Sequence, residues 1–255
     1  MNEIDAFSLT TVPLQQLANG QPMKSATGFV WKEGLQHYLI TNWHVITGRN
    51  AVSGELETEA RPDTLRALFN VRIGDFGKQQ YDIKIRDDDG RPRWLIYPGR
   101  GRGIDVVALP LPMSGDDPVM TMFPINSVTS PPLRIRIGMD VFILGYPFGA
   151  EPPAFPVWKR GSIASEPDLV RLTTGYYLVD TASRPGMSGA PVILRSWTND
   201  FVDGSVRAIS DKPATNFIGV YSGRLGAPSS DAQIGMVWHG TYVHDIIAGN
   251  MRDED

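Results

Sequence analysis

Short apolar runs separated by glycine, proline and aspartate make up most of the hydrophobic pattern of this chain. Residues 81–86 alternate polar and apolar side chains with a period of two, as a half-buried antiparallel strand does, and residues 87–90 predict the turn that follows. The whole pattern predicts strands at 27–31, 37–42, 67–73, 81–86, 93–97, 105–111, 139–145, 157–165, 169–174, 176–182, 190–195, 217–222 and 234–239. We therefore expect an all-β protein.

Helical periodicity is confined mainly to residues 242–247, where apolar side chains recur at i, i+3 and i+4. Thr241 is placed to cap this helix and Gly249 to stop it. Residues 112–133 are rich in proline and lack a strand period. This segment is therefore the best candidate for a connection between two structural units.

Composition narrows the class of protein further. The 255 residues are 42% hydrophobic, enough for one large core or two smaller ones, and no run of about 18 apolar residues predicts a membrane span. Residues 1–6 show no basic region followed by an apolar run, so no secretory signal is visible. The absence of cysteine excludes disulfides and thiol catalysis, and together these features favour a cytoplasmic location.

The charge pattern bears on binding partners. The net charge is −4, and charges of both signs are dispersed along the chain. Such a surface has no electrostatic feature that would attract nucleic acid or an anionic membrane. We expect neither as a partner.

The segment 184–191, RPGMSGAP, sets Ser188 between glycines directly before an apolar strand, as an exposed nucleophile requires. Gly186 allows close approach of the backbone to an anionic intermediate, because no Cβ is in the way. His44 lies upstream in TNWHVI, and Asp105 opens a strand in GIDVVAL. An α/β-hydrolase has its serine first and carries Gly-x-Ser-x-Gly, so the order His, Asp, Ser and the sequence GMSGA argue against that class.

These three segments resemble those of the trypsin-like (chymotrypsin-fold) serine peptidases, most closely the bacterial Deg/HtrA-type proteases. Four further segments resemble motifs of that family in the correct order: ATGFV at 26–30, GYPFG at 145–149, DTA at 180–182 and GVYSG at 219–223. The resemblance covers roughly residues 22–248. It implies a serine endopeptidase without cofactor or metal, built from two six-stranded antiparallel Greek-key β-barrels, with a short C-terminal helix against the second.

The resemblance also implies a division of the chain. The expected units are an N-terminal arm at 1–21, a first barrel at 22–115, a linker at 116–133, a second barrel with the C-terminal helix at 134–248, and an acidic tail at 249–255. His44 and Asp105 then belong to the first barrel and Ser188 to the second. The active site should lie in the cleft between them. The arm either packs on the barrels or reaches a partner.

The predicted chemistry depends on these residue types. A serine hydroxyl is hardly ionised at neutral pH and needs a base, and histidine, with a pKa of about 6.5, can take the proton and return it to the leaving amine. In this scheme Ser188 attacks the scissile carbonyl, His44 is base and then acid, and Asp105 orients the imidazole.

Each candidate also has a purely structural interpretation: a turn serine, a core histidine or a surface aspartate. The remaining histidines, His37, His239 and His244, lie early in a strand, before a glycine turn and on the terminal helix, outside any peptidase motif. Asp75 and residues 87–89 are alternatives to Asp105, but they lie in a glycine-rich turn and a solvated loop.

The resemblance assigns an oxyanion hole and a substrate site. The backbone N–H groups of Gly186 and Ser188 would form the hole, with that of Met187 on the same turn. Ala182, six residues before Ser188, would form the base of the S1 pocket, where a preference for arginine or lysine requires an acid. The remaining predicted substrate contacts are Ser183 and Arg184 beside the pocket, Tyr221 narrowing it, and Ser222, Gly223 and Arg224 pairing with an extended substrate.

We therefore expect a polypeptide substrate with a small or medium apolar P1 residue, such as Ala, Val or Leu. An acidic P1 residue is unsupported, because glutamate-preferring relatives carry a histidine near the position of Tyr221.

Two departures from family patterns concern regulation. Met187 stands where animal relatives have the aspartate that receives a freed N-terminus, so that activation route is not expected. The chain reaches Asp255 after its acidic tail, which leaves no room for a PDZ domain. Control would then come from a narrow target range or an activating protein partner.

Two competing classes remain. One is a peptidase fold that binds peptides but is inactive or latent. The other is a metal-dependent hydrolase, which has little support because there is no His-Glu-x-x-His, no cysteine and only four scattered histidines.

Overall fold

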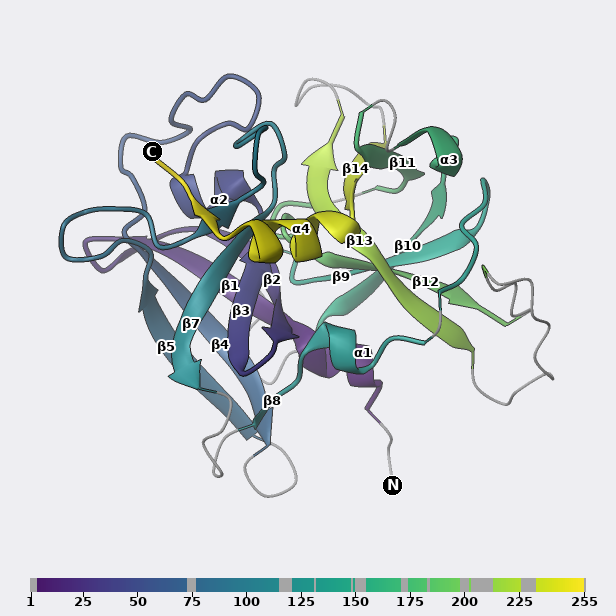
Figure 1. Ribbon diagram of the computed structural model, residues 1–255, viewed down its shortest axis with the longest axis horizontal. Coiled ribbons are helices and arrows are strands. Elements are labelled where there is room, and N and C mark those ends of the chain that lie inside the picture. The colour runs from purple at the N-terminus through teal and green to yellow at the C-terminus, as the bar shows by residue number, and fades with distance from the viewer. Residues whose placement is uncertain are drawn as a thin grey trace.

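The structure is a computed structural model that describes residues 4–72, 77–114, 121–130, 132–147, 149, 155–170, 174–182, 184–197, 202, 213–225 and 233–254. Strands are by far the commonest regular structure among these residues and helices are few and short, so the predicted all-β class is confirmed. Two units lie side by side in Figure 1, and the C-terminal end of the chain returns to the N-terminal unit.

The N-terminal unit is one antiparallel sheet. Its strands run in the order β15-β6-β7-β3-β2-β1-β4-β5, with β8 paired to β4. They are β1 (Thr11–Ala18), β2 (Gln21–Glu33), β3 (Gln36–Thr41), β4 (Thr64–Arg72), β5 (Gly77–Lys84), β6 (Leu95–Ile96), β7 (Val107–Ser114), β8 (Thr121–Met122) and β15 (Met251–Arg252). Their inner face buries a core that includes Leu39, Leu65, Phe69 and Trp94.

The C-terminal unit is a closed barrel of six antiparallel strands, in the order β10-β11-β14-β13-β12-β9. The strands are β9 (Asp140–Gly145), β10 (Val157–Ile163), β11 (Tyr176–Asp180), β12 (Pro191–Ser196), β13 (Ala214–Arg224) and β14 (Ile234–His239). One of the two predicted barrels is thus present. Strand pairing in the described part of the N-terminal unit is an open path, and its closure into a second barrel stays a prediction.

The helices are short: α1 (Ala6–Thr10), α2 (Trp43–Thr47), the 3₁₀ turn η1 (Ile125–Ser127), α3 (Pro167–Val170) and α4 (Thr241–Gly249). The predicted C-terminal helix is α4, but its caps differ from those expected. Its N-cap is Gly240 and its C-cap is Asn250, at a φ of 46°. The Thr241 hydroxyl, which the sequence predicts to cap the helix, bonds to His239 Nδ1 (2.9 Å).

Helix α4 lies across the junction of the two units (Figure 1). The sequence predicts it against the second barrel, and an aromatic side chain of the helix does contact β14 of that barrel. The helix also packs against β6 and β7 of the N-terminal sheet, which the sequence does not predict. Val243 and Ile246 are buried in a cluster that also holds Leu95 from the sheet and Val220 from the barrel. This shared apolar cluster holds the two units together.

Three segments differ from the sequence predictions. Residues 169–174 are predicted as a strand, but 167–170 form α3, since Pro167 suits a first helical turn; residues 171–173 lie outside the described residues. The expected arm at 1–21 contains β1, which pairs with both β2 and β4. The expected linker at 116–133 contributes β8 to the sheet as well as the turn η1.

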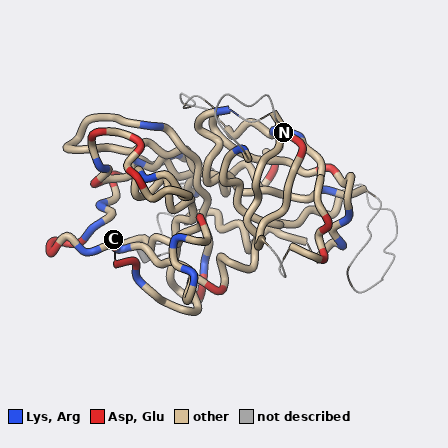
Figure 2. Tube along the Cα trace, turned by 90° about the horizontal axis from the view of Figure 1, so that it is seen from above, with Lys and Arg blue, Asp and Glu red and all other residues tan. Residues whose placement is uncertain are grey.

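Lysine and arginine are interspersed with aspartate and glutamate over both units, as Figure 2 shows. No helix within the described ranges has the length and apolar character needed to cross a membrane.

Candidate active site

Helix α2 carries His44. It begins after Asn42 and ends at Gly48, which adopts a φ of 70° and donates its N–H to the His44 carbonyl (3.0 Å). Such a short helix is not stable alone, so contacts with the rest of the fold must hold it. One of these comes from β1, where the amide of buried Gln16 donates to the Val45 carbonyl (2.6 Å).

Asp105 lies beside His44 and is buried, with only 2% of its surface exposed. Its Oδ2 is 2.7 Å from His44 Nδ1, and its Oδ1 accepts the backbone N–H of His44 (2.9 Å). Asn42 Nδ2 donates to the Asp105 backbone carbonyl (2.6 Å). These bonds fix both the position of the helix and the plane of the imidazole, with Nε2 left for another partner.

The Ser222 hydroxyl, from β13 of the barrel, also donates to Asp105 Oδ2. The sequence assigns Ser222 only to substrate binding, so its contact with the carboxylate is an addition. The contact joins residues that are 117 positions apart and links the barrel to the hydrogen-bonded pair of His44 and Asp105.

The pKa of His44 is raised above its usual value of 6.5. Burial lowers this pKa, but the negative charge of Asp105 and its hydrogen bond to the ring raise it by more, with a further contribution from Glu57. The Lys24 ammonium, 2.8 Å from Glu57, acts in the opposite direction. A base of this kind accepts a proton readily near neutral pH.

Two successive turns present Ser188. The first is closed by the Met187 N–H, which donates to the Arg184 carbonyl (3.3 Å); Pro185 is its second residue, and Gly186, at a φ of 95°, is its third. Proline followed by a residue of positive φ is the pattern of a type II turn. The Ala190 N–H closes the next turn by donating to the Met187 carbonyl (3.1 Å).

Thr27 of β2 anchors these turns to the N-terminal sheet. Its N–H donates to the Ser188 carbonyl (2.9 Å), and its hydroxyl donates to the Gly186 carbonyl (2.7 Å). A Cβ on Gly189 would lie 2.1 Å from the Thr27 carbonyl oxygen, so only glycine fits there. The sequence includes Thr27 in a family-like motif but does not identify this anchoring role.

Two backbone donors of the turn are available for a ligand. Among the described residues, the N–H groups of Gly186 and Ser188 donate to no acceptor, whereas that of Met187 is used inside the turn. The Ser188 hydroxyl likewise has no hydrogen-bond partner among the described residues, and it makes no hydrogen bond to His44. The predicted hydrogen bond between Ser188 and His44 is therefore not formed in this structure.

Three consecutive residues that are predicted to bind substrate, 222–224, lie at the end of β13. The β12–β13 ladder ends with Pro191 opposite Val220, while β13 continues to Arg224 with β14 as its neighbour among the described strands. Gly223 and exposed Arg224 thus lie on an edge that an extended peptide could join. Ala182 is half-buried after β11.

The other residues that are predicted to line the substrate pocket are Tyr221, Arg184 and Ser183. The Tyr221 ring is buried and packs on β14, where a Cβ on Gly235 would lie 2.6 Å from Tyr221 Cε2. Arg184 is exposed at the start of the serine turn, and Ser183 lies outside the described residues.

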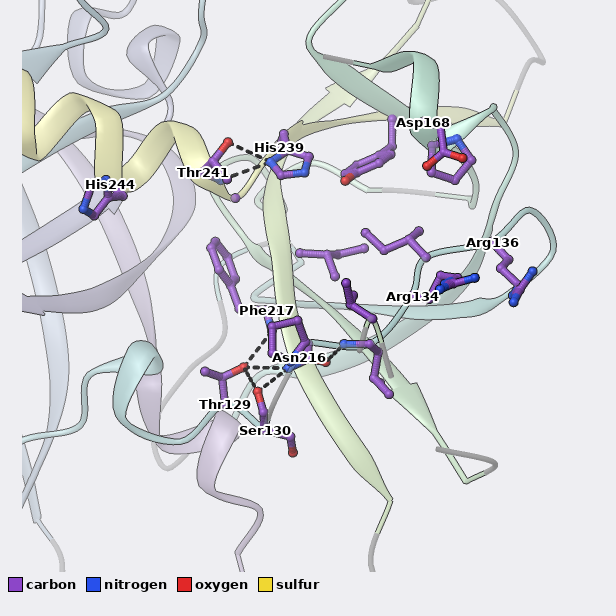
Figure 3. A pocket seen from close by; sticks show the side chains of 18 of the residues that line it. Thr129, Ser130, Arg134, Arg136, Asp168, Asn216, Phe217, His239, Thr241 and His244 are labelled. Carbon is purple, nitrogen blue, oxygen red and sulfur yellow. Dashed lines mark hydrogen bonds between the residues drawn. The ribbon is translucent and has the colours of Figure 1, made fainter. Parts of the chain in front are cut away.

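A cavity of about 1130 Å³ lies elsewhere, beside the segment 129–137 and the ends of β13 and β14. Figure 3 shows Arg134 and Arg136 on one side of it and His239 and His244 on another. None of His44, Asp105 and Ser188 lines it. This cavity is therefore separate from the cluster around His44.

The sequence profile of the trypsin-like peptidase domain matches residues 26–198. The chain belongs to this family. It is accordingly a serine endopeptidase, and the predicted likeness to Deg/HtrA-type proteases is confirmed. No curated protein sequence matches the chain.

Solved structures share the fold of this trypsin-like peptidase. The active form of the Rv3671c protease from M. tuberculosis has a TM-score of 0.53 at 19% identity, covering 98% of this chain and 84% of that one. The serine endoprotease from Yersinia pestis has a TM-score of 0.53 at 12% identity, covering 99% of this chain and 69% of that one. The HtrA-type protease AlgW with tripeptide has a TM-score of 0.51 at 16% identity, covering 95% of this chain and 60% of that chain.

Proposed function

We propose that this trypsin-like peptidase cleaves polypeptides through a Ser188–His44–Asp105 triad and an acyl-enzyme. The observation that carries the proposal is the buried Asp105 carboxylate, which holds His44 Nδ1 at 2.7 Å and leaves Nε2 free to act as a base. Ser188 lies on a turn that Thr27 fixes to the N-terminal unit, which also carries His44 on α2. In each cycle His44 would remove the hydroxyl proton of Ser188 and deliver it to the leaving amine.

The oxyanion that forms during attack needs preorganised donors. The N–H groups of Gly186 and Ser188 donate to no acceptor within the described ranges and suit this role, and the positive φ of Gly186 sets the orientation of the turn. The Met187 N–H is used within the turn, so we propose two donors rather than the three that the sequence suggests. Removing one such donor typically lowers turnover on the order of 10²- to 10³-fold.

For specificity we propose a small or medium apolar P1 residue. The support is Ala182, which supplies no charge, and the buried Tyr221 ring, which occupies space beneath the substrate strand. The edge of β13 at Gly223 and Arg224, which pairs only with β14 among the described strands, would bind the substrate backbone, whatever the side chains of the substrate are.

Cleavage of a peptide library tests the proposed specificity. The wild type should cut after Ala, Val or Leu, should be inhibited by serine-directed reagents and should resist chelators. Ala182→Asp should shift the P1 preference toward Lys and Arg, because it places a carboxylate at the proposed base of the pocket. Ala164→Asp adds the same charge at an exposed position and should leave the profile unchanged. A basic P1 preference in the wild type would contradict the proposal.

The raised pKa of His44 predicts a pH profile. A general base must be neutral, so kcat/KM should increase as the pH rises through an apparent pKa above 6.5. Glu57→Gln removes a charge that raises this pKa and should move the rise to lower pH, whereas Lys24→Gln should move it to higher pH. Both displacements should shrink at high salt, since the two side chains are partly exposed. Shifts in the same direction would show that the profile reports another group.

A second candidate function is a latent peptidase in the cytoplasm that requires an activating partner. The observation that favours it is the Ser188 hydroxyl, which makes no hydrogen bond to His44 among the described residues. In a latent form, binding of the partner would bring the two side chains into contact. The labelling experiment that closes the Discussion separates the two candidates.

A further inference from the structure

The segment that follows α4 leaves the barrel and joins the N-terminal sheet. Met251 and Arg252 form β15, which pairs with Ile96 and Leu95 of β6, and in Figure 1 the chain then ends close to α2. Part of the segment that the sequence predicts to be an acidic tail, 249–255, is thus built into the sheet. It connects the unit that carries Ser188 with the unit that carries His44.

Asp253, the next residue, accepts two hydrogen bonds from indole groups. Its Oδ2 accepts the Nε1–H of Trp43 (2.8 Å) and that of Trp94 (2.9 Å), while its Oδ1 accepts the backbone N–H of Glu254. Both tryptophans are buried, with 2% and 0% of their surfaces exposed. Hydrogen bonds to a charged acceptor in such surroundings are worth more than neutral bonds at the surface.

Two arginine side chains interact electrostatically with Asp253. Arg61 and Arg86 both have pKa values lowered by burial and by neighbouring arginine charge, and the negative charge of Asp253 opposes that lowering in each. The guanidinium of Arg86 also lies 5.2 Å from the centre of the Trp94 ring. Asp253 thus occupies a cationic site lined by the two indoles.

The contact with Trp43 matters because Trp43 directly precedes His44 in α2. Consecutive side chains on a helix point about 100° apart, so fixing the indole on one side also fixes the direction of the imidazole on the other. The helix has only five residues and depends on outside contacts for its position. The Gln16 amide donates a hydrogen bond to one backbone carbonyl of the helix, and Asp253 accepts one from the side chain of the first helical residue.

We propose that Asp253 is a positioning residue for the active site, which holds His44 in place through the indole of Trp43. This inference rests on the proposed function, in which His44 activates Ser188. A displacement of about 1 Å in a catalytic group can lower the rate by about 100-fold. Loss of the Asp253–Trp43 bond should therefore reduce turnover while leaving the substrate strand, and so KM, nearly unchanged.

The test measures the rate at which a fluorophosphonate labels Ser188, together with kcat and KM on a peptide substrate. Asp253→Ala and Trp43→Phe should each slow labelling and lower kcat by about 10- to 100-fold. The double variant should be hardly slower than either single variant, because both remove the same bond. If Asp253→Ala does not fold, as judged by circular dichroism, Trp43→Phe decides the matter.

Trp94→Phe is the matched control. It deletes a hydrogen bond of nearly equal length to the same oxygen, but Trp94 is not part of α2. It should lower thermal stability and yet keep the labelling rate within about twofold of the wild type. Glu254→Gln, an exposed neighbour, should change neither property.

Two results would overturn the inference. One is an unchanged labelling rate in Asp253→Ala, and the other is equal slowing by Trp94→Phe and Trp43→Phe, which would indicate a general loss of stability. A wild-type protein that does not label at all would instead refute the proposal of a peptidase active without a partner and favour the latent candidate, and the inference, which rests on the active enzyme, would fall with it.

Discussion

Replacing Ser188 or His44 by alanine should abolish nearly all peptidase activity. Each substitution removes the covalent route, Ser188→Ala by deleting the nucleophile and His44→Ala by deleting its base. In a triad that acts as a unit, such losses reach about 10⁶-fold in kcat. The proposed binding of substrate to the edge of β13 uses other groups, so the KM of the residual activity should change little.

The double variant distinguishes a triad from two independent contributions. If Ser188 and His44 act in one step, Ser188→Ala/His44→Ala should be hardly less active than either single variant. His244→Ala is the matched control, because this exposed histidine of α4 has no role in the proposal and should keep wild-type turnover. Wild-type cleavage by Ser188→Ala, after contaminating proteases are excluded, would end the proposal.

The second large effect is expected from Asp105→Asn, which should preserve the fold and lower kcat by about 10⁴-fold. An amide at this position can donate to His44 Nδ1, which would place the imidazole proton on Nε2, where the proton of Ser188 must be accepted. The substitution also disturbs the bonds from the His44 backbone and the Ser222 hydroxyl.

Circular dichroism should show whether Asp105→Asn still folds, and pre-steady-state kinetics should show whether acylation is the step that slows. Asp87→Asn makes the same chemical change on the loop that the sequence offers as an alternative acid. In the described part of the chain Asp87 accepts hydrogen bonds from loop backbone groups, such as the Arg91 N–H, and forms an ion pair with an arginine that is distant in the sequence. Equal losses from both variants would contradict the assignment of Asp105.

Much of the strand pattern could be predicted because it depends on local alternation of apolar residues. β1 could not, since Pro13 and the pair Gln15 and Gln16 interrupt the period of two. Gln16 is nevertheless buried, because its amide finds the Val45 carbonyl of α2, which is 29 residues away. A polar residue whose partner is supplied by the tertiary fold gives no local signal of burial.

The same reason explains β15. An acidic run after a helix is typical of a solvated tail, but Asp253 meets two indole N–H groups that are 210 and 159 residues away in the chain. Conversely, Leu169 and Val170 suit a strand, yet Pro167 starts a helical turn there, and the backbone restriction outweighs the side-chain preference.

The candidate site was easier to predict than its supports. Ser188, His44 and Asp105 stand in short motifs with recognisable neighbours, and the structure places Asp105 against His44. The hydroxyls of Thr27 and Ser222 bond across the junction of the two units. Their directions depend on how the sheet and barrel are packed, which residue spacing does not specify.

The most direct test of the account is to treat the purified wild-type chain with a fluorophosphonate and to identify the labelled residue by mass spectrometry. The account predicts rapid labelling of Ser188 alone, and loss of that labelling in His44→Ala, because the reagent requires a hydroxyl activated by its base. An unlabelled Ser188 would favour the latent candidate over a peptidase that is active without a partner. Equally fast labelling of Ser188 without His44 would contradict the claim that this serine and this histidine form the catalytic centre.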